Sequence, residues 1–156
     1  MVEKDDGTAK ASNGFYLMGL YYDGAYVDFI IESDRDITDA VLVMRIQTEY
    51  DDKTFNPDIF GIYVNDNDYS LEYDEITFTT DITRDSTSSA RNEFVNVVIT
   101  EYLELKKGEN RIRFLVTNDI YHGGTRQADA PIIDCIYIYT DATLTWEPKT
   151  DNTKNN

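Results

Sequence analysis

The chain has 156 residues, which is enough for one domain with a buried core. Its residues are 41% hydrophobic and 28% charged, a composition typical of a globular domain and not of a disordered segment. The formal net charge is −16, so the surface repels nucleic acid and anionic membranes, and we expect neither as a partner.

Short apolar or alternating runs recur along the chain, whereas no long window repeats apolar residues at helical spacing. These runs predict strands, in chain order, at residues 15–22, 25–32, 39–49, 59–65, 69–73, 75–80, 93–105, 110–117, 132–140 and 143–147. The pair Asp23-Gly24 predicts a tight hairpin turn, and turns are also expected at 65–68 and around Gly108. This spacing of short strands predicts an all-β fold, an antiparallel β-sandwich.

We predict one module over residues 1–148, followed by a polar tail or linker over 149–156. No apolar run approaches the roughly 20 residues that cross a membrane, and the first ten residues lack the apolar core of a signal peptide. If the parent protein is secreted, this chain is one module of it. Cys135 is the single cysteine, which excludes an internal disulfide, and its apolar surroundings predict a buried, inert thiol.

The sequence offers little chemistry for catalysis. It contains no GxSxG elbow, HExxH, P-loop or GxGxxG pattern, and its one cysteine and one histidine are expected in a strand and a loop respectively. A carboxylate pair of the kind that hydrolyses glycosides stays open, because an acidic chain has many candidates. We predict that the chain is not an enzyme.

Asp134 lies in an otherwise apolar predicted strand. It either faces solvent at the end of the sheet or needs a cation or hydrogen-bond donors, because an unpaired buried charge is costly. Acids near the other terminus, Glu3 and Asp5 among them, could supply further ligands. Calcium is the metal that suits such oxygen ligands.

The stretch "NDIYHGGTRQADAP" (118–131) joins two predicted strands and is longer than a hairpin loop. Sugar rings stack their apolar faces on aromatic rings, and their hydroxyls bind polar side chains. The candidates for such contacts in this loop are Tyr121, His122, Asn118, Arg126, Gln127 and Asp129. Tyr50 and Phe55 form a possible second platform. The alternative is that these rings pack onto their own loops.

Four stretches, "YYDGAYVDFIIESDRDITDAVLVMRIQ", "FGIYVNDNDYSLEY", "VVITEYLELKKGENRIRFLVTND" and "APIIDCIYIYT", resemble in their order the carbohydrate-binding modules of families 6 and 35. The resemblance covers roughly residues 19–140. It implies a galactose-binding-like jelly roll, a non-catalytic module that binds a polysaccharide or oligosaccharide. It also implies that the module tethers a larger extracellular bacterial protein of glycan degradation to its glycan.

The resemblance implies particular site residues as well. A structural calcium would be held by Glu3, Asp5 and Asp134, although "VEKDD" departs from the family's "EAE"-like segment. Tyr22, or its neighbour Tyr21, matches the aromatic residue that precedes the "GxYV" strand.

Two further family positions differ in this chain. Phe94 is the nearest aromatic residue to an expected tryptophan, and Ile133 replaces an expected asparagine. These departures leave two alternatives: the sugar site has shifted toward the 118–131 loop, or sugar binding has been lost. The alternative function is an extracellular protein-interaction or adhesion module, for which a flat apolar patch on a sheet face would be the sign.

Overall fold

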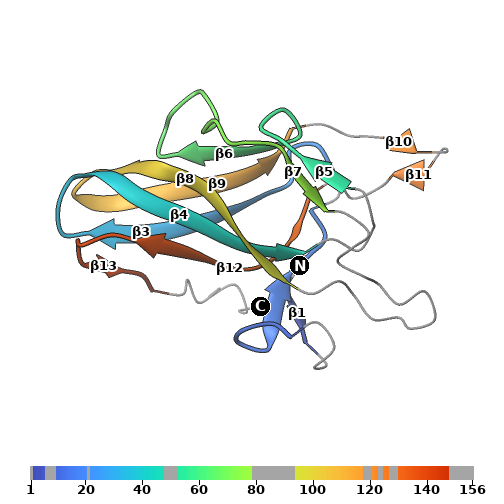
Figure 1. Cartoon of the computed structure of the whole chain (residues 1–156), viewed down its shortest axis with the longest axis horizontal. Coiled ribbons are helices and arrows are strands. Elements are labelled where there is room, and N and C mark those ends of the chain that lie inside the picture. The colour runs from blue at the N-terminus through green and yellow to red at the C-terminus, as the bar shows by residue number, and fades with distance from the viewer. Residues whose placement is uncertain are drawn as a thin grey trace, which may run out of the picture.

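The computed structural model describes residues 2–5, 10–20, 22–47, 53–78, 94–117 and 130–147, together with two short strands at 121–122 and 125–126. These residues form thirteen strands and no helix (Figure 1). The strands are β1 (Val2–Lys4), β2 (Phe15–Leu17), β3 (Tyr26–Ser33), β4 (Ile37–Gln47), β5 (Lys53–Phe55), β6 (Phe60–Val64), β7 (Ile76–Phe78), β8 (Val95–Leu105), β9 (Gly108–Val116), β10 (Tyr121–His122), β11 (Thr125–Arg126), β12 (Ile132–Tyr139) and β13 (Leu144–Thr145).

Two antiparallel sheets build the domain. The larger sheet has the order β1-β2-β12-β4-β8, and the smaller has the order β13-β3-β9-β6. Two separate strand pairs, β5-β7 and β10-β11, lie toward the same end of the molecule (Figure 1). The predicted all-β antiparallel sandwich is therefore confirmed. The described residues include no helix long and apolar enough to cross a membrane.

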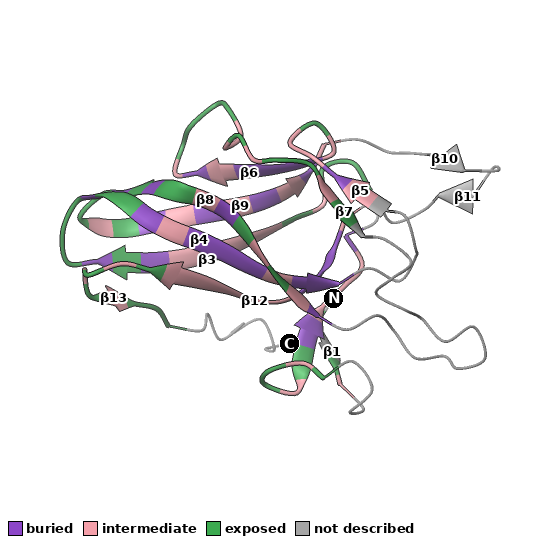
Figure 2. Ribbon diagram, in the orientation of Figure 1, coloured by how far each residue is buried: buried purple, intermediate pink, exposed green. Residues whose placement is uncertain are grey.

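The core follows from the alternation of side chains along each strand. On β9, Ile112, Phe114 and Val116 are buried, while the residues between them are partly exposed. The Phe114 ring stacks on Phe60 at a centroid distance of 5.8 Å and meets Phe29 edge-on at 5.5 Å. Buried positions continue along β4 and β6 (Figure 2), so the two sheets share one apolar core.

The predicted hairpin at Asp23-Gly24 is wrong, although the turn itself exists. The carbonyl of Tyr22 accepts the Ala25 N–H at 2.9 Å, and Gly24 has a φ of 84°. However, β2 belongs to the larger sheet and β3 to the smaller one, so the turn carries the chain between layers. Turn chemistry specifies a reversal of the chain, but it does not specify which strands then pair.

The segment 69–73, predicted as a strand, does not belong to a sheet. Ser70 Oγ accepts the Ile62 N–H at 2.9 Å, and the Leu71 N–H donates to the Ile62 carbonyl at 2.7 Å. The Tyr73 hydroxyl donates to the Phe60 carbonyl at 2.5 Å. Two hydrogen bonds that involve side chains and one between backbone groups thus hold this segment against β6 without a strand ladder.

The two sheets leave facing strand edges that are only partly paired. β12 pairs with β4 along its length, but it meets β2 only at Ile133. β3 pairs with β9 along its length, but it meets β13 only at Glu32 and Ser33. Among the described residues, 134–139 and 26–31 therefore carry a strand edge without a ladder partner.

Candidate functional site

The first part of the predicted sugar site lies at the end of the sandwich where β3 begins. Tyr22 precedes this strand and is 50% exposed, as a sugar-contacting ring must be. The Gly24 N–H donates to the Val116 carbonyl at 2.8 Å, which anchors the turn to the end of β9. Tyr22 is thus presented to solvent by a turn that is tied to the core strands.

The long connection 118–131 contains a short hairpin that the sequence did not predict. β10 pairs with β11 in the register Tyr121↔Arg126 and His122↔Thr125. This hairpin lies beyond the ends of both sheets (Figure 1). The side chains of these residues, and the whole of Asn118, Gln127, Asp129 and Tyr50, lie outside the described part of the chain, so their sugar contacts stay a prediction.

Phe55 does not offer the exposed platform that was predicted for it. Its ring is 1% exposed and belongs to the main core cluster, while its strand pairs with β7 in the register Phe55↔Ile76. An apolar ring gains more free energy from full burial than from exposure beside acids. The prediction for Phe55 is therefore wrong in this arrangement.

The two family positions that differ in this chain are also buried. Phe94 is 5% exposed and packs against Tyr16 with a centroid distance of 6.2 Å, and Ile133 is 1% exposed. Neither side chain is exposed enough to contact a ligand. The aromatic residues available for a ligand must be sought elsewhere on the surface.

Asp134 lies beside a cationic side chain, Arg45. Its side chain is fully buried, and the Arg45 Nε donates to its Oδ2 at 2.7 Å. Ser12 adds its backbone N–H to Oδ1 at 3.0 Å and its hydroxyl to the same oxygen at 2.9 Å. A bulge between Ile133 and Cys135 turns Asp134 toward these partners. The buried carboxylate is thus compensated within the chain.

These contacts do not fit the calcium that the resemblance implies. A cation on Asp134 would face the Arg45 guanidinium, and like charges at such a distance repel. Asp5 accepts the Ala11 N–H at 2.7 Å, and the side chain of Glu3 lies outside the described residues. In the described part of the chain, no three metal-ligating side chains cluster. The proposed set Glu3, Asp5 and Asp134 is therefore not supported.

A further polar and aromatic cluster lies on the outer face of the smaller sheet. Arg113 donates to both carboxylate oxygens of Asp28, at 2.7 and 2.8 Å, and its guanidinium lies 4.1 Å from the centre of the Tyr26 ring. The hydrogen bond to Asp28 raises the pKa of Arg113. The alternation in "YVDF" puts Tyr26 and Asp28 on one face, but the sequence does not reveal that Arg113 is opposite Asp28.

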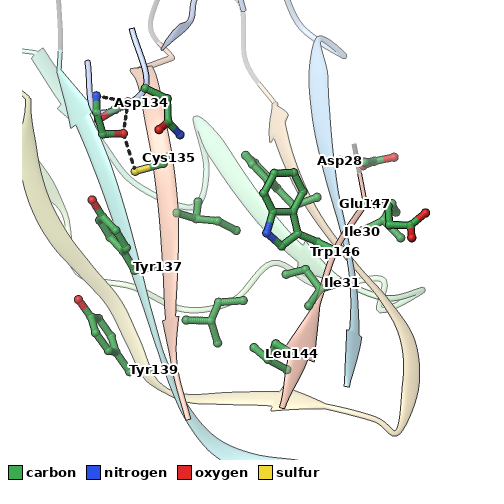
Figure 3. A pocket seen from close by; sticks show the side chains of 15 residues that line it. Asp28, Ile30, Ile31, Asp134, Cys135, Tyr137, Tyr139, Leu144, Trp146 and Glu147 are labelled. Atoms are coloured by element: carbon green, nitrogen blue, oxygen red, sulfur yellow. Dashed lines mark hydrogen bonds between the residues drawn. The ribbon is translucent and has the colours of Figure 1, made fainter. Parts of the chain in front are cut away.

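A groove of about 870 Å³ lies between β12 and β3, along the unpaired edges described above (Figure 3). Its volume falls in the range of pockets that hold small ligands. Besides these two strands, Ser12 and Asn13 line it, together with Leu144, Trp146 and Glu147 of the C-terminal segment. Trp146 is 70% exposed. The sequence predicted neither this groove nor a role for Trp146.

Cys135 also lines this groove and is half-buried, not buried as predicted. A hydrogen bond with its thiol raises the pKa of the Tyr137 phenol. Tyr137 and Tyr139 stack at a centroid distance of 6.3 Å and project from the face of β12 that points away from β3 (Figure 3). The inner face of β12 therefore gives the groove aliphatic side chains, while its tyrosines face outward.

Comparisons with known proteins agree with this architecture. No family model matches the chain, and no curated protein matches its sequence. The structure is similar to a family 35 carbohydrate-binding module from an environmental isolate, with a TM-score of 0.61, 16% identity, and coverage of 95% of this chain and 88% of that chain. It is similar to the family 35 module from Clostridium thermocellum, with a TM-score of 0.58, 20% identity, and coverage of 90% and 87% respectively.

A third similar structure is a Xyl-CBM35 in complex with a glucuronic acid containing disaccharide, with a TM-score of 0.59 and 15% identity. The match covers 95% of this chain and 90% of that chain. The chain therefore has the fold of the family 35 carbohydrate-binding modules over nearly its whole length. At these identities the likeness establishes the fold.

Proposed function

We propose that this chain is a non-catalytic carbohydrate-binding module, which binds a polysaccharide or oligosaccharide and tethers a larger extracellular protein to glycan. The observation that carries the proposal is the shared fold over 90–95% of the chain with solved modules described as carbohydrate-binding. The ligands of those modules are properties of those proteins and are not carried over to this chain. The sequence resemblance, which rests on strand motifs in order, supports the same function.

We assign this binding to the end of the sandwich where β3 begins, which we call the loop end. Tyr22 is exposed there, and the turn that carries it is anchored to β9. The β10-β11 hairpin carries Tyr121 and His122 beyond the ends of the sheets at the same end (Figure 1). An exposed ring beside polar side chains supplies the two kinds of contact that a sugar needs.

Affinity gel electrophoresis against starch, xylan, mannan, pectin and β-glucan tests the proposal. We expect retardation on at least one of these glycans, and a weaker effect for Tyr22→Ala and Tyr121→Ala. Tyr102→Ala is a matched control, because Tyr102 is 75% exposed on β8, away from the loop end. A folded protein that migrates freely on every glycan would refute the proposal.

A protein-interaction or adhesion module is the second candidate, and a feature of the larger sheet favours it. Tyr137, Val43 and Val98 are cross-strand neighbours on β12, β4 and β8, which makes a row on the outer face of this sheet. Val98 is 56% exposed, and Tyr139 in the next row is 59% exposed. Val43 is buried, so Val98 and Tyr139 are the exposed apolar side chains of this face that suit a partner protein. A Val98→Asp variant that loses a partner but keeps its glycan retardation would support this reading.

A further inference from the structure

The C-terminal segment brings the single tryptophan of the chain to the groove between β12 and β3. β13 pairs with β3 in the register Leu144↔Ser33 and Thr145↔Glu32, so the chain returns along the edge of the smaller sheet. The Trp146 indole then lies in the space between the two strands, near Ile31 (Figure 3). With 70% of its surface exposed, the indole presents a ring to solvent at the groove.

The inner side of this groove is apolar. Phe29 and Ile31 of β3, with Ile136 and Ile138 of β12, point toward the shared core and also line the groove. Three of these four side chains are only partly buried, because no strand covers the core at this edge in the described residues. The indole therefore lies beside a strip of accessible apolar surface, which can hold an apolar face of a ligand.

The rim of the groove is polar and acidic. Asp28 is held in one orientation by the two hydrogen bonds from Arg113, and Glu147 and Asn13 are further rim residues. The unpaired edges of β12 and β3 add backbone N–H and C=O groups. This supplies hydrogen-bond donors and acceptors on both sides of an apolar strip.

We propose that this groove is a second binding site, which holds a neutral saccharide chain with one pyranose ring stacked on Trp146. A sugar ring combines an apolar C–H face with hydroxyls at its edge, which matches the strip and the rim. Acidic glycans are disfavoured by the Glu147 carboxylate and by the net charge of −16, whereas the charge of Asp28 is compensated by Arg113. The groove is separate from the loop end. The choice of a saccharide as its ligand rests on the proposed function, whereas the groove itself does not.

The alternative occupant is an extended peptide that adds a strand to one of the open edges. The edge of β12 is broken by the bulge between Ile133 and Cys135, and β13 covers the end of β3 at Ser33. Both features shorten the ladder that an added strand could form. The indole and the acidic rim are not needed for strand addition, so the observations favour the saccharide.

Intrinsic fluorescence tests the proposal directly, because Trp146 is the only tryptophan in the protein. Soluble fragments of xylan, mannan, β-glucan and starch are titrated into the whole chain. We expect a saturable change in emission with at least one of them, and reduced quenching of the indole by acrylamide at saturation. Fragments of pectin, which are acidic, should change the emission much less.

Trp146→Ala should raise the Kd for the active glycan about five-fold or more, which is the loss expected for one stacking contact of roughly 1 kcal/mol. Trp146→Phe should lie between this variant and the wild type, because it keeps a smaller ring. Tyr102→Ala serves as the exposed-aromatic control. If a Trp146 variant fails to fold, the fluorescence titration of the wild-type protein still tests the proposal.

The outcomes separate this site from the loop end. Suppose that a glycan retards the protein in the gel, but does not change the emission of Trp146, and that Trp146→Ala binds this glycan as tightly as the wild type does. The groove proposal then fails and the proposed function stands. If no glycan binds at all, both fail. An emission change of equal size with pectin and neutral fragments would overturn the assignment to neutral saccharides.

Discussion

Replacing Arg45 by methionine tests whether the Arg45 side chain, and not a bound cation, compensates the buried negative charge of Asp134. The Arg45 side chain is 23% exposed, and its carboxylate partner is fully buried. Arg45 also approaches the carbonyls of Phe94 and Lys10 at 3.4 Å each, and its guanidinium lies 5.6 Å from the centre of the Phe94 ring. One side chain thereby joins β4, β12, the start of β8 and the N-terminal segment.

The expected loss of stability follows from the burial of the pair. Removing one partner of a buried ion pair typically costs about 3–5 kcal/mol, because the remaining charge stays buried without compensation. Arg45 is partly exposed and Ser12 still donates to Asp134, so we expect the lower end, about 3 kcal/mol. With a urea m-value of about 2 kcal/mol/M, the unfolding midpoint should fall by roughly 1.5 M.

Urea unfolding followed by circular dichroism measures this loss, and Arg35→Met is a matched control. Arg35 pairs with Asp141 at 2.6 Å, but the two side chains are 50% and 89% exposed, so its loss should cost less than about 1 kcal/mol. The double variant Arg45→Met/Asp134→Asn should recover part of the loss, since no buried charge remains. Equal midpoint shifts for Arg45→Met and Arg35→Met would refute the reasoning.

Three further predictions concern metal, pH and backbone. Because Arg45 neutralises Asp134, we expect neither EDTA nor added CaCl₂ to change the melting temperature of the wild type, and a chelator-induced decrease would contradict this. Burial raises the pKa of Tyr73, so ionisation opposes folding as the pH rises above the unfolded value of about 10. Stability should therefore fall more steeply above pH 10 in the wild type than in Tyr73→Phe, as measured by urea unfolding at each pH. Gly108 has a φ of 93°, so Gly108→Ala should cost about 1–2 kcal/mol, whereas a neutral effect would show that the turn relaxes.

The strands of the core could be predicted because their signal is local. In β9, apolar residues alternate with polar ones, and this period of two is itself the pattern of a strand with one buried face. The missed strands β1 and β5 have three residues each and contain charged residues, so no alternation could reveal them. The local sequence also could not predict that β2 and β3 belong to different sheets, since this depends on which distant strands each of them pairs with.

The candidate sites divide in the same way. The sequence indicated an aromatic residue before the β3 strand, and Tyr22 is exposed there. It also indicated that Asp134 needed a partner or exposure. It could not name Arg45, which lies 89 positions away and meets Asp134 only through the register of β12 against β4 and the bulge beside it. The burial of Phe55 likewise depends on strand pairing and core packing, not on its neighbours in sequence.

By itself, then, the sequence determined the all-β class, most of the long strands, the strong negative charge and the family-like order of motifs, because each of these depends on composition or on near neighbours. The tertiary structure alone decided which charges meet, which rings are covered and where the sandwich stays open. The Trp146 groove is the clearest case: it exists because β13 returns to β3 while β12 keeps a free edge. Contacts between distant segments arise only when the sheets pack, and no local pattern contains them.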